Sequence, residues 1–397
     1  MMITNVSDDR KKILVLSDYY LPGFRAGGGL RTIVNIVDRL SKRYDFWIVT
    51  RDHDSRLDKT PYKTVNINEW NTVGAAQVFY LSHDNLKIPT IEKLVGEVAP
   101  QAIYLNSFFA TPANFLLFLR WRGRIKCPVI MAPCGELITA AMQFKTLKKK
   151  LHIFACGVMG LHKGLIWKAT TGLERTDIEK VLGKKNEMYV AADLPPKTIF
   201  PDYDPSLKPK KIPGELKLVF LARFVRTKNF AFLFDLLDNI TGKISIDVIG
   251  DLEDKNYWDE CLEKIRGLPG NITVNYLGAI DNRLVPKKLA EYHFLVLPTL
   301  NENFGHVFLE ALSAGCPLII SDRTPWLGLE EKNVGWDIPL EKKQAWMEAL
   351  QKCVAMDQPE YKKLSDSSRA FAADWLADES LEKDTIAVFE AALKTSK

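Results

Sequence analysis

Short apolar runs alternate with longer amphipathic stretches from one end of this chain almost to the other. This pattern constrains the fold more than any other feature, because a short apolar run bounded by turn residues is typical of a strand buried on both faces. The amphipathic stretches are typical of helices that cover such strands. The sequence therefore predicts an α/β protein with doubly wound parallel sheets, followed from about residue 344 by a wholly helical end.

The expected elements can be placed by residue number. We expect strands at residues 13–16, 46–49, 77–81, 103–105, 129–132, 188–191, 216–221, 244–249, 272–277, 294–297, 318–320 and 335–338. We expect helices at residues 31–40, 229–240, 257–266, 308–314, 342–355, 360–376 and 381–393. The apolar segment 151–167 contains His152, His162 and Lys163, which favours a buried or interfacial helix over a membrane-spanning one.

The length of 397 residues predicts two domains, because it exceeds what one hydrophobic core usually organises. A proline-rich stretch at residues 194–214 predicts a linker between them. We expect Rossmann-like domains at residues 1–193 and 215–375. A C-terminal helix at residues 376–397 is expected to pack back on the first domain.

The two halves of the chain differ in charge. Residues 1–200 hold 29 Lys and Arg against 18 Asp and Glu, whereas residues 201–397 hold 25 against 31. Within residues 111–150 the only acidic residue is Glu136, and the basic residues are Arg120, Arg122, Arg124, Lys126, Lys145, Lys148, Lys149 and Lys150. This cluster suits anionic lipid headgroups or a phosphate-bearing substrate, and a solvated helix face explains it equally well. Nucleic acid is the least favoured partner, because no stacking aromatic residues are interleaved.

The cysteines and the N-terminal region bear on the compartment. The six cysteines form no C-x-x-C pair, and the apolar run at residues 13–16 is too short for a signal peptide. We therefore expect reduced thiols and a cytoplasmic protein.

Ligands of open α/β sheets bind beyond the carboxyl ends of the strands, so the residues that follow each strand are the candidates for a site. Gly27, Gly28 and Gly29 follow the first strand and open a helix. Such glycines let backbone N–H groups approach an anion, although a flexible turn explains the run as well. Their spacing is neither the dinucleotide fingerprint nor the P-loop, which disfavours a dehydrogenase and a nucleoside triphosphatase.

Two basic residues follow the first strand of the second half. Arg223 offers a planar fork and Lys228 a mobile point charge, which is the pair that a diphosphate requires. Solvated loop cations are the alternative.

Two acidic residues follow the strand at residues 294–297, with Glu302 in the loop and Glu310 on the helix. A loop carboxylate can accept hydroxyl hydrogen bonds while the helical carboxylate reaches another part of the same ligand. Between them, the N–H groups of Gly305, His306 and Val307 stand at a helix N-terminus, where they face an anion. This set suits a polyhydroxylated phosphate ester, and an ordinary amphipathic helix with two solvated acids is the alternative.

In these residues the chain resembles the family 4 glycosyltransferases, retaining enzymes of GT-B fold that transfer a sugar from a nucleotide diphosphate donor. The resemblance rests on the E-x7-E segment from Glu302 to Glu310, the Ala-Leu-Ser-Ala-Gly-Cys-Pro stretch at its end, and Arg223 and Lys228 in the expected order. It implies that Glu302 contacts the donor sugar, that Glu310 binds the ribose, and that the two cations hold the diphosphate. The further donor-binding positions that it implies are Phe304, Gly305, His306, Val307, Gly28, Gly29 and Gly278.

The first half is similar to a bacterial polysaccharide-assembly subgroup at residues 106–109, 132–136 and 148–150. The resemblance implies that Asn106, Gly135 and Glu136 contact the acceptor or the sugar. Cys134 stands where the subgroup commonly has Arg, and Asn106 follows a strand after which many family members have His. Asn106 can supply a neutral hydrogen bond but no proton at neutral pH.

Metal and thiol chemistry are not expected. Residues 52–54, Asp-His-Asp, are similar to the D-x-D metal clamp of another glycosyltransferase architecture, but they follow a different strand, so we expect a surface loop. The histidines show no zinc spacing, and we expect the ring of His306 to face solvent. Cys134 and Cys316 are expected to be structural thiols.

The resemblance therefore implies a retaining, metal-independent glycosyltransferase with no cofactor. It would move a hexose-type sugar from a UDP- or GDP-linked donor, bound by the second half, to a glycan or lipid-linked acceptor, bound by the first. The expected setting is bacterial polysaccharide assembly at the inner face of the cytoplasmic membrane, with the region 111–150 on anionic lipid. The alternatives are a non-catalytic nucleotide-sugar-binding subunit, a GT-B epimerase or phosphorylase, and an NAD-dependent dehydrogenase.

Overall fold

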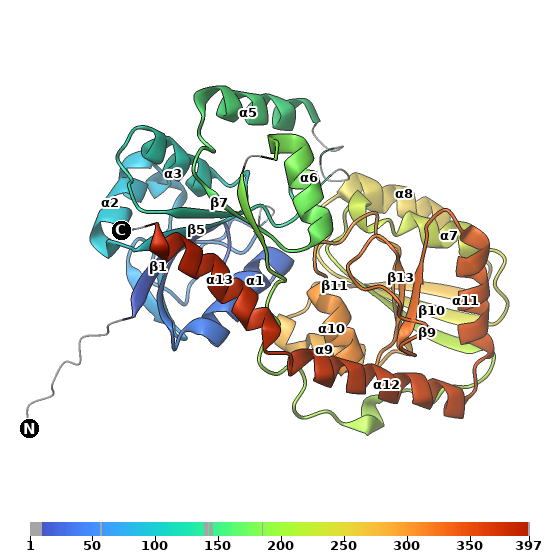
Figure 1. Ribbon diagram of the computed structural model, residues 1–397. Coiled ribbons are helices and arrows are strands. Elements are labelled where there is room, and N and C mark those ends of the chain that lie inside the picture. The colour runs from blue at the N-terminus through green and yellow to red at the C-terminus, as the bar shows by residue number, and fades with distance from the viewer. Residues whose placement is uncertain (1–9, 56–57, 139–141, 143–145, 185, 396–397) are drawn as a thin grey trace, which may run out of the picture. The chain divides into compact units, whose positions relative to one another are not determined.

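The computed structural model describes residues 10–55, 58–138, 142, 146–184 and 186–395 (Figure 1). The chain divides into two compact units. Unit 1 comprises Met1–Leu194 and Glu379–Lys397, and unit 2 comprises Pro195–Asp378. Lys145 of the basic cluster lies outside the described residues.

Unit 1 is built on an eight-stranded sheet with the order β3-β4-β2-β1-β5-β6-β7-β8. Its strands are β1 (Lys11–Ser17), β2 (Tyr44–Arg51), β3 (Trp70–Val73), β4 (Ala76–Leu81), β5 (Ala102–Asn106), β6 (Val129–Ala132), β7 (Ile166–Ala169) and β8 (Glu187–Val190). Its helices are α1 (Gly28–Leu40), α2 (Ile88–Val98), α3 (Thr111–Trp121), α5 (Thr146–Met159), α6 (Gly172–Leu182) and α13 (Ser380–Lys394), with the 3₁₀ helix η1 (His83–Asn85). All neighbouring strands are parallel except β3 and β4, which are antiparallel.

Helices cover both faces of this sheet. The cluster on one face joins buried side chains of α1 and α13 to alternate residues of the strands, such as Ile13 and Val15 of β1. The cluster on the other face takes Leu14 and Leu16 of the same strand and packs them with α2, α3 and α6. Successive side chains of a strand point to opposite faces, so a wholly apolar strand fills two cores.

Unit 2 is built on a six-stranded parallel sheet with the order β11-β10-β9-β12-β13-β14. Its strands are β9 (Glu215–Leu221), β10 (Lys243–Ile249), β11 (Ile272–Gly278), β12 (Phe294–Leu297), β13 (Leu318–Ser321) and β14 (Gly335–Ile338). Its helices are α7 (Ala231–Leu237), α8 (Lys255–Arg266), α9 (Val285–Leu289), α10 (His306–Ser313), α11 (Lys343–Ala355) and α12 (Gln358–Leu376). Its 3₁₀ helices are η2 (Pro205–Leu207), η3 (Arg226–Lys228) and η4 (Asn282–Leu284).

The prediction of an α/β protein with parallel sheets is confirmed, and each expected strand has a counterpart within a few residues. Two strands were not expected, namely β3 and β7. The expectation of one helix over residues 151–167 is wrong. Helix α5 ends at Met159, and Gly160 and Gly164, both at positive φ, turn the chain into β7.

The proline-rich segment is packed on unit 2. Its Ile199, Phe200, Tyr203 and Leu207 lie against the core of that unit, and Lys208 Nζ donates to the carbonyl of Tyr292 at 3.1 Å. Within the described residues, no helix has both the length and the apolar character needed to cross a bilayer.

Candidate functional site

The carboxyl ends of β9 and β12 mark the point in unit 2 where ligands of this sheet type bind. The strand order runs outward from β9 through β10 and β11, and in the other direction from β12 through β13 and β14. The chain therefore leaves β9 and β12 in opposite directions, and this reversal is the ligand-binding position of open α/β sheets. Both predicted cations follow β9, and both predicted acids follow β12.

The two loops at this position are bonded to each other. The carbonyl of Thr227 accepts hydrogen bonds from the backbone N of Leu300 at 2.8 Å and from Thr299 Oγ1 at 3.0 Å. The backbone N of Glu302 donates to the carbonyl of Arg323 at 2.9 Å, which ties the loop after β12 to the loop after β13. Three loops are thus fixed around Glu302.

Lys228 and Glu302 form an ion pair at this position, with Lys228 Nζ in direct contact with Glu302 Oε2. The two residues are 74 positions apart in sequence, and their side chains are only 15% and 17% exposed. A diphosphate that entered here would compete with Glu302 for the ammonium group. Glu302 would then be left to accept hydrogen bonds from sugar hydroxyls.

Helix α10 begins immediately after this pair. Its N-cap, Gly305, has a φ of 80°, and a Cβ there would lie 2.5 Å from the Phe308 ring, so glycine is required. Glu310, in the second turn, is a buried residue. The positive N-terminal end of α10 therefore lies near Glu302, and Glu310 lies on the helix itself.

Phe304 is buried and His306 is half-buried. The Phe304 ring is buried against Trp326 and Trp375, and its carbonyl accepts a 2.6 Å hydrogen bond from Trp326 Nε1. The prediction that the His306 ring faces solvent is therefore met only in part. Its Nε2 is buried, and its ring centroid lies 4.8 Å from that of Phe304.

Arg223 lies toward the outer strands of the sheet. Its Nη1 is 2.7 Å from Glu253 Oε2, and its side chain is 44% exposed. Gly278 ends β11, and its carbonyl accepts a 3.0 Å hydrogen bond from the backbone N of Gly250. Sequence reasoning did not identify Glu253, which lies after β10 with no motif to mark it.

Unit 1 has its own strand-order reversal between β1 and β5, where the glycine run and Asn106 lie. Gly28 and Gly29 are the first residues of α1, and Asn106 Nδ2 donates to the carbonyl of Gly29 at 2.9 Å. Asn106 Oδ1 accepts from Cys134 Sγ at 3.1 Å. The Asn106 amide therefore fixes the glycine run to the ends of β5 and β6.

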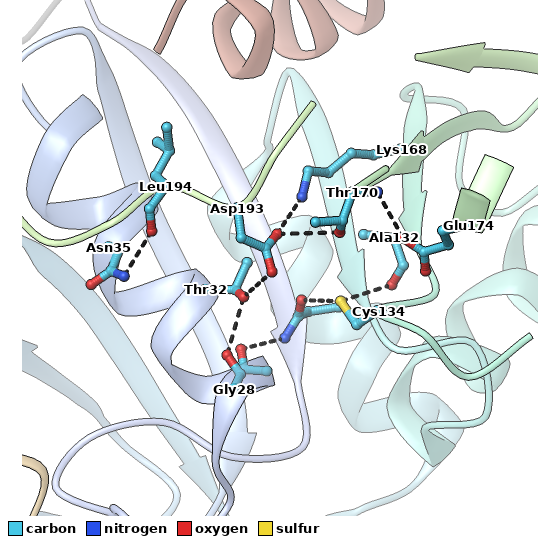
Figure 2. A network of polar contacts seen from close by, with 12 residues as sticks. Gly28, Thr32, Asn35, Ala132, Cys134, Lys168, Thr170, Glu174, Asp193 and Leu194 are labelled. Atoms are coloured by element: carbon cyan, nitrogen blue, oxygen red, sulfur yellow. Dashed lines mark hydrogen bonds and ion pairs between the residues drawn. The ribbon is translucent and has the colours of Figure 1, made fainter. Parts of the chain in front are cut away.

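A network of buried polar side chains lies next to this edge, as Figure 2 shows. Lys168 Nζ lies 2.6 Å from Asp193 Oδ1, and Asp193 Oδ2 accepts from Thr32 Oγ1 at 2.9 Å. Thr32 Oγ1 is also 3.1 Å from the carbonyl of Gly28. Burial lowers the pKa of Lys168, but the Asp193 carboxylate outweighs this and raises it above its usual range. The network was missed, although a lysine within the apolar run of β7 was a signal for it.

Gly135 and Glu136 are also held by the fold. The backbone N of Gly135 donates to Glu174 Oε1 at 2.6 Å. Glu136 Oε2 accepts from the backbone N of Phe108 at 2.7 Å and from that of Phe109 at 3.0 Å. Burial raises the pKa of Glu136, although these N–H donors act in the opposite direction. Glu136 thus fixes the loop that leads into α3.

The prediction of a surface loop at residues 52–54 is wrong, because Asp52, His53 and Asp54 are all buried. Asp54 Oδ1 accepts from the backbone N of Phe24 at 2.7 Å and of Arg25 at 3.0 Å, so it anchors the loop after β1. Among the described residues, no group of three or more His, Cys, Asp or Glu side chains is arranged to hold a metal ion.

The comparison with protein families concerns unit 2. Residues 204–371 match the family described as "Glycosyl transferases group 1". Unit 2 carries a glycosyltransferase group 1 domain. Arg223, Lys228, Glu302 and Glu310 all lie within this glycosyltransferase domain. No curated protein sequence matches the chain.

Solved structures match nearly the whole chain. Sucrose-phosphate synthase from Thermosynechococcus elongatus is 15% identical, with a TM-score of 0.72 over 97% of this chain and 100% of that one. Anabaena Alr3699/HepE in complex with UDP and glucose is 16% identical, with a TM-score of 0.68 over 96% and 100%. WaaG, a glycosyltransferase involved in lipopolysaccharide biosynthesis, is 14% identical, with a TM-score of 0.64 over 95% and 98%. The chain has the GT-B fold.

Proposed function

We propose that the protein is a retaining, metal-independent glycosyltransferase of the family 4 type. It moves a hexose-type sugar from a UDP- or GDP-linked donor to a glycan or lipid-linked acceptor. The observation that carries this proposal is the Lys228–Glu302 pair at the carboxyl ends of β9 and β12, beside the N-terminus of α10. A cation, an acid and a helix N-terminus at one sheet position suit a ligand that is both a diphosphate and a sugar.

In the proposed reaction the bond between the anomeric carbon and the diphosphate oxygen breaks, and a bond to an acceptor hydroxyl oxygen forms on the same face. The acceptor proton passes to an oxygen of the departing diphosphate. Lys228 and Arg223 stabilise the negative charge that develops there, Glu302 orients the sugar and Glu310 binds the ribose. The protein's contribution is therefore positioning and electrostatic stabilisation.

The neighbours support the donor class and the setting. The HepE structure contains UDP and glucose, and WaaG takes part in lipopolysaccharide biosynthesis. For this chain we propose a role in bacterial polysaccharide assembly, on the cytoplasmic side of the membrane. The acceptor would lie on unit 1, at the edge shaped by Asn106, Gly135 and Glu136.

The first test is a thermal-shift panel of UDP, GDP and ADP with their common sugars. A ligand that binds only the native state stabilises it by about 2.7 kcal/mol at a hundredfold excess over its Kd. We expect one nucleotide family to raise the melting temperature. The shift should be lost in Arg223→Ala and in Glu310→Ala, but kept in Arg226→Ala, whose parent side chain pairs with Glu260.

Turnover separates the proposal from its alternatives. Once the donor is identified, Lys228→Ala is expected to lower the rate of sugar transfer at least about a hundredfold. NMR of the product made by the parent protein should show that the anomeric configuration of the donor sugar is retained. Binding without turnover favours a non-catalytic subunit, and isomerisation of the free donor favours an epimerase. No shift with any nucleotide overturns the donor site itself.

A further inference from the structure

Helix α5 carries an apolar stripe on its exposed face. Leu147, Leu151, Phe154 and Val158 are 81%, 66%, 69% and 73% exposed, respectively, and we call these four residues the α5 stripe. Their spacing of four, three and four residues places them on one face of an α-helix, within an arc of about 60°. Large side chains exposed to this extent make few contacts within the chain, so the stripe offers its area to a partner.

The opposite face of α5 is fixed to unit 1. Cys156 is buried in the core, and Ile153 packs against the same cluster. The ring of His152 lies 5.5 Å from that of Phe109 and 5.9 Å from that of Phe108. The helix is therefore amphipathic with one face already docked, and the fold holds the stripe outward.

Lysines flank the stripe on both sides. Lys148 and Lys150 are exposed, and they lie about 100° and about 60° from Leu147 in opposite directions around the helix. Between them, Lys149 turns back over the Phe109 ring at 5.4 Å. Helix α5 contains no acidic residue. The outward surface is thus apolar along its centre and positive along its margins.

The apolar surface continues beside the stripe. A hollow of about 800 Å³ is bounded by Phe154 and Val158 on one side and by Val181 and Leu182 of α6 on another. Its rim also carries Lys150 and Lys163. The apolar area available to a partner is therefore larger than the stripe alone.

We propose that the α5 stripe, with Lys148 and Lys150, docks the protein on an anionic lipid membrane. An exposed apolar face bordered by lysines is the composition of a helix that lies in the membrane interface, with the apolar side chains among the upper acyl chains and the ammonium groups at the phosphates. Lysine is depleted in protein–protein interfaces, which argues against a protein occupant. This inference names a docking surface and does not rest on the proposed transfer reaction.

Two members of the basic cluster outside this helix are held by groups of unit 1. Arg120 donates to the carbonyls of Lys163 and Gly164, at 2.7 and 3.0 Å, and Arg124 pairs with Glu92 at 2.6 Å. These two arginines already bind protein groups. Arg122 and Lys126 are exposed but do not lie on α5. We assign Lys148 and Lys150 to lipid because they border the stripe on the same helix.

The test is sedimentation of the full chain with vesicles of phosphatidylcholine alone or of an equal mixture with phosphatidylglycerol. We expect binding to the mixed vesicles and at least tenfold weaker binding to the neutral ones. Leu151→Glu with Phe154→Glu should lower the partition coefficient at least tenfold. The control is Ile212→Glu. Ile212 is an apolar side chain of unit 2 that is 47% exposed, and its substitution should leave the partition coefficient unchanged.

Charge is tested separately. The double variant Lys148→Glu with Lys150→Glu should weaken vesicle binding by about fivefold or more per lysine. Higher salt should also weaken binding of the parent protein. The control Lys93→Glu, on α2, should leave binding unchanged. Circular dichroism melts establish that each variant is folded. The proposal is overturned if the parent does not sediment with anionic vesicles, or if neither double variant changes its binding. It is also overturned if the stripe variant alters only the oligomeric state in light scattering, since the stripe would then join two copies of this chain.

Discussion

His293 precedes β12 in unit 2 and is the clearest source of pH dependence at the scale of a single residue. It is buried, its Nδ1 accepts a 3.0 Å hydrogen bond from the backbone N of Lys217, and its ring packs edge-on against Tyr361. Burial lowers the pKa of His293 to about 3, and the nearby charges of Lys211, Lys208 and Lys217 act in the same direction. The folded protein therefore keeps this ring neutral at mildly acidic pH.

The stability of unit 2 is expected to fall as the pH drops below about 6.5. In that range the unfolded chain protonates His293, whose unfolded pKa is near 6.5, while the folded chain does not, so protons favour unfolding. Between pH 7.5 and pH 5 this one residue should cost on the order of 2 kcal/mol. Urea unfolding at both pH values measures the change.

The variant His293→Gln distinguishes the contribution of His293 to the pH dependence of stability from that of the carboxylates, which also titrate in acid. The loss of stability between pH 7.5 and pH 5 should be smaller in the variant than in the parent, whatever the absolute stability of the variant. Burial lowers the pKa of His162 in unit 1 to about 4, so His162 contributes to the loss of stability with falling pH in both proteins. An identical slope in parent and variant contradicts the prediction.

At the residue scale, the sequence indicates which side chains to inspect but not what holds them. The spacing of Glu302 and Glu310, and the order of Arg223 and Lys228 before them, suffice to choose these four. The contact of Lys228 with Glu302 depends on β9 lying beside β12, which no local pattern specifies. Asn106 shows the same limit, because its bond to Gly29 requires β5 beside β1.

At the scale of elements, the two missed strands have different explanations. In β3 no residue is buried and the strand pairs only with β4, so it lacks the apolar run that marks a strand. In β7 every residue is buried, but one of them is Lys168, which interrupts the run. A lysine is tolerated there only because Asp193, from the segment after β8, neutralises it.

The Lys168–Asp193 pair therefore joins β7, α1 and the end of the β8 segment, and breaking it should destabilise unit 1. Lys168→Met leaves a buried carboxylate without its cation, which is expected to cost about 3–5 kcal/mol of unfolding free energy. The control, Lys180→Met, removes an exposed lysine that pairs with Asp177 on α6, and it should cost less than about 1 kcal/mol. Urea unfolding of both variants measures the difference.

A second substitution distinguishes the charge from the lost packing. Lys168→Met combined with Asp193→Asn removes the unpaired charge and keeps the volume, so it should recover part of the stability lost in Lys168→Met alone. If the double variant is less stable than the single one, the carboxylate does not depend on Lys168 for its burial.

At the scale of the whole molecule, the chain leaves unit 1 after Leu194 and returns to it at Glu379. The returning helix, α13, supplies Val388, Phe389 and Ala392 to the core on the α1 face of the first sheet. Ion pairs of Arg39 with Glu382 and of Arg43 with Glu390 also join this helix to the rest of unit 1. Helix α13 therefore stabilises unit 1, while the core of unit 2 is formed without it.

This arrangement predicts that a substitution in α13 weakens unit 1 and leaves unit 2 intact. Phe389 is buried, and its ring centroid lies 5.3 Å from that of Tyr44, 5.8 Å from Tyr104 and 6.2 Å from Phe46. Phe389→Ala should cost about 3–5 kcal/mol through lost apolar contact and the cavity left behind. Hydrogen exchange should show faster exchange in β1, β2 and β5 and unchanged exchange in β9 and β12. Lys383→Ala, an exposed position of the same helix, should change neither set. Faster exchange in both sheets of Phe389→Ala would mean that the two units unfold as one, and that α13 stabilises the molecule as a whole.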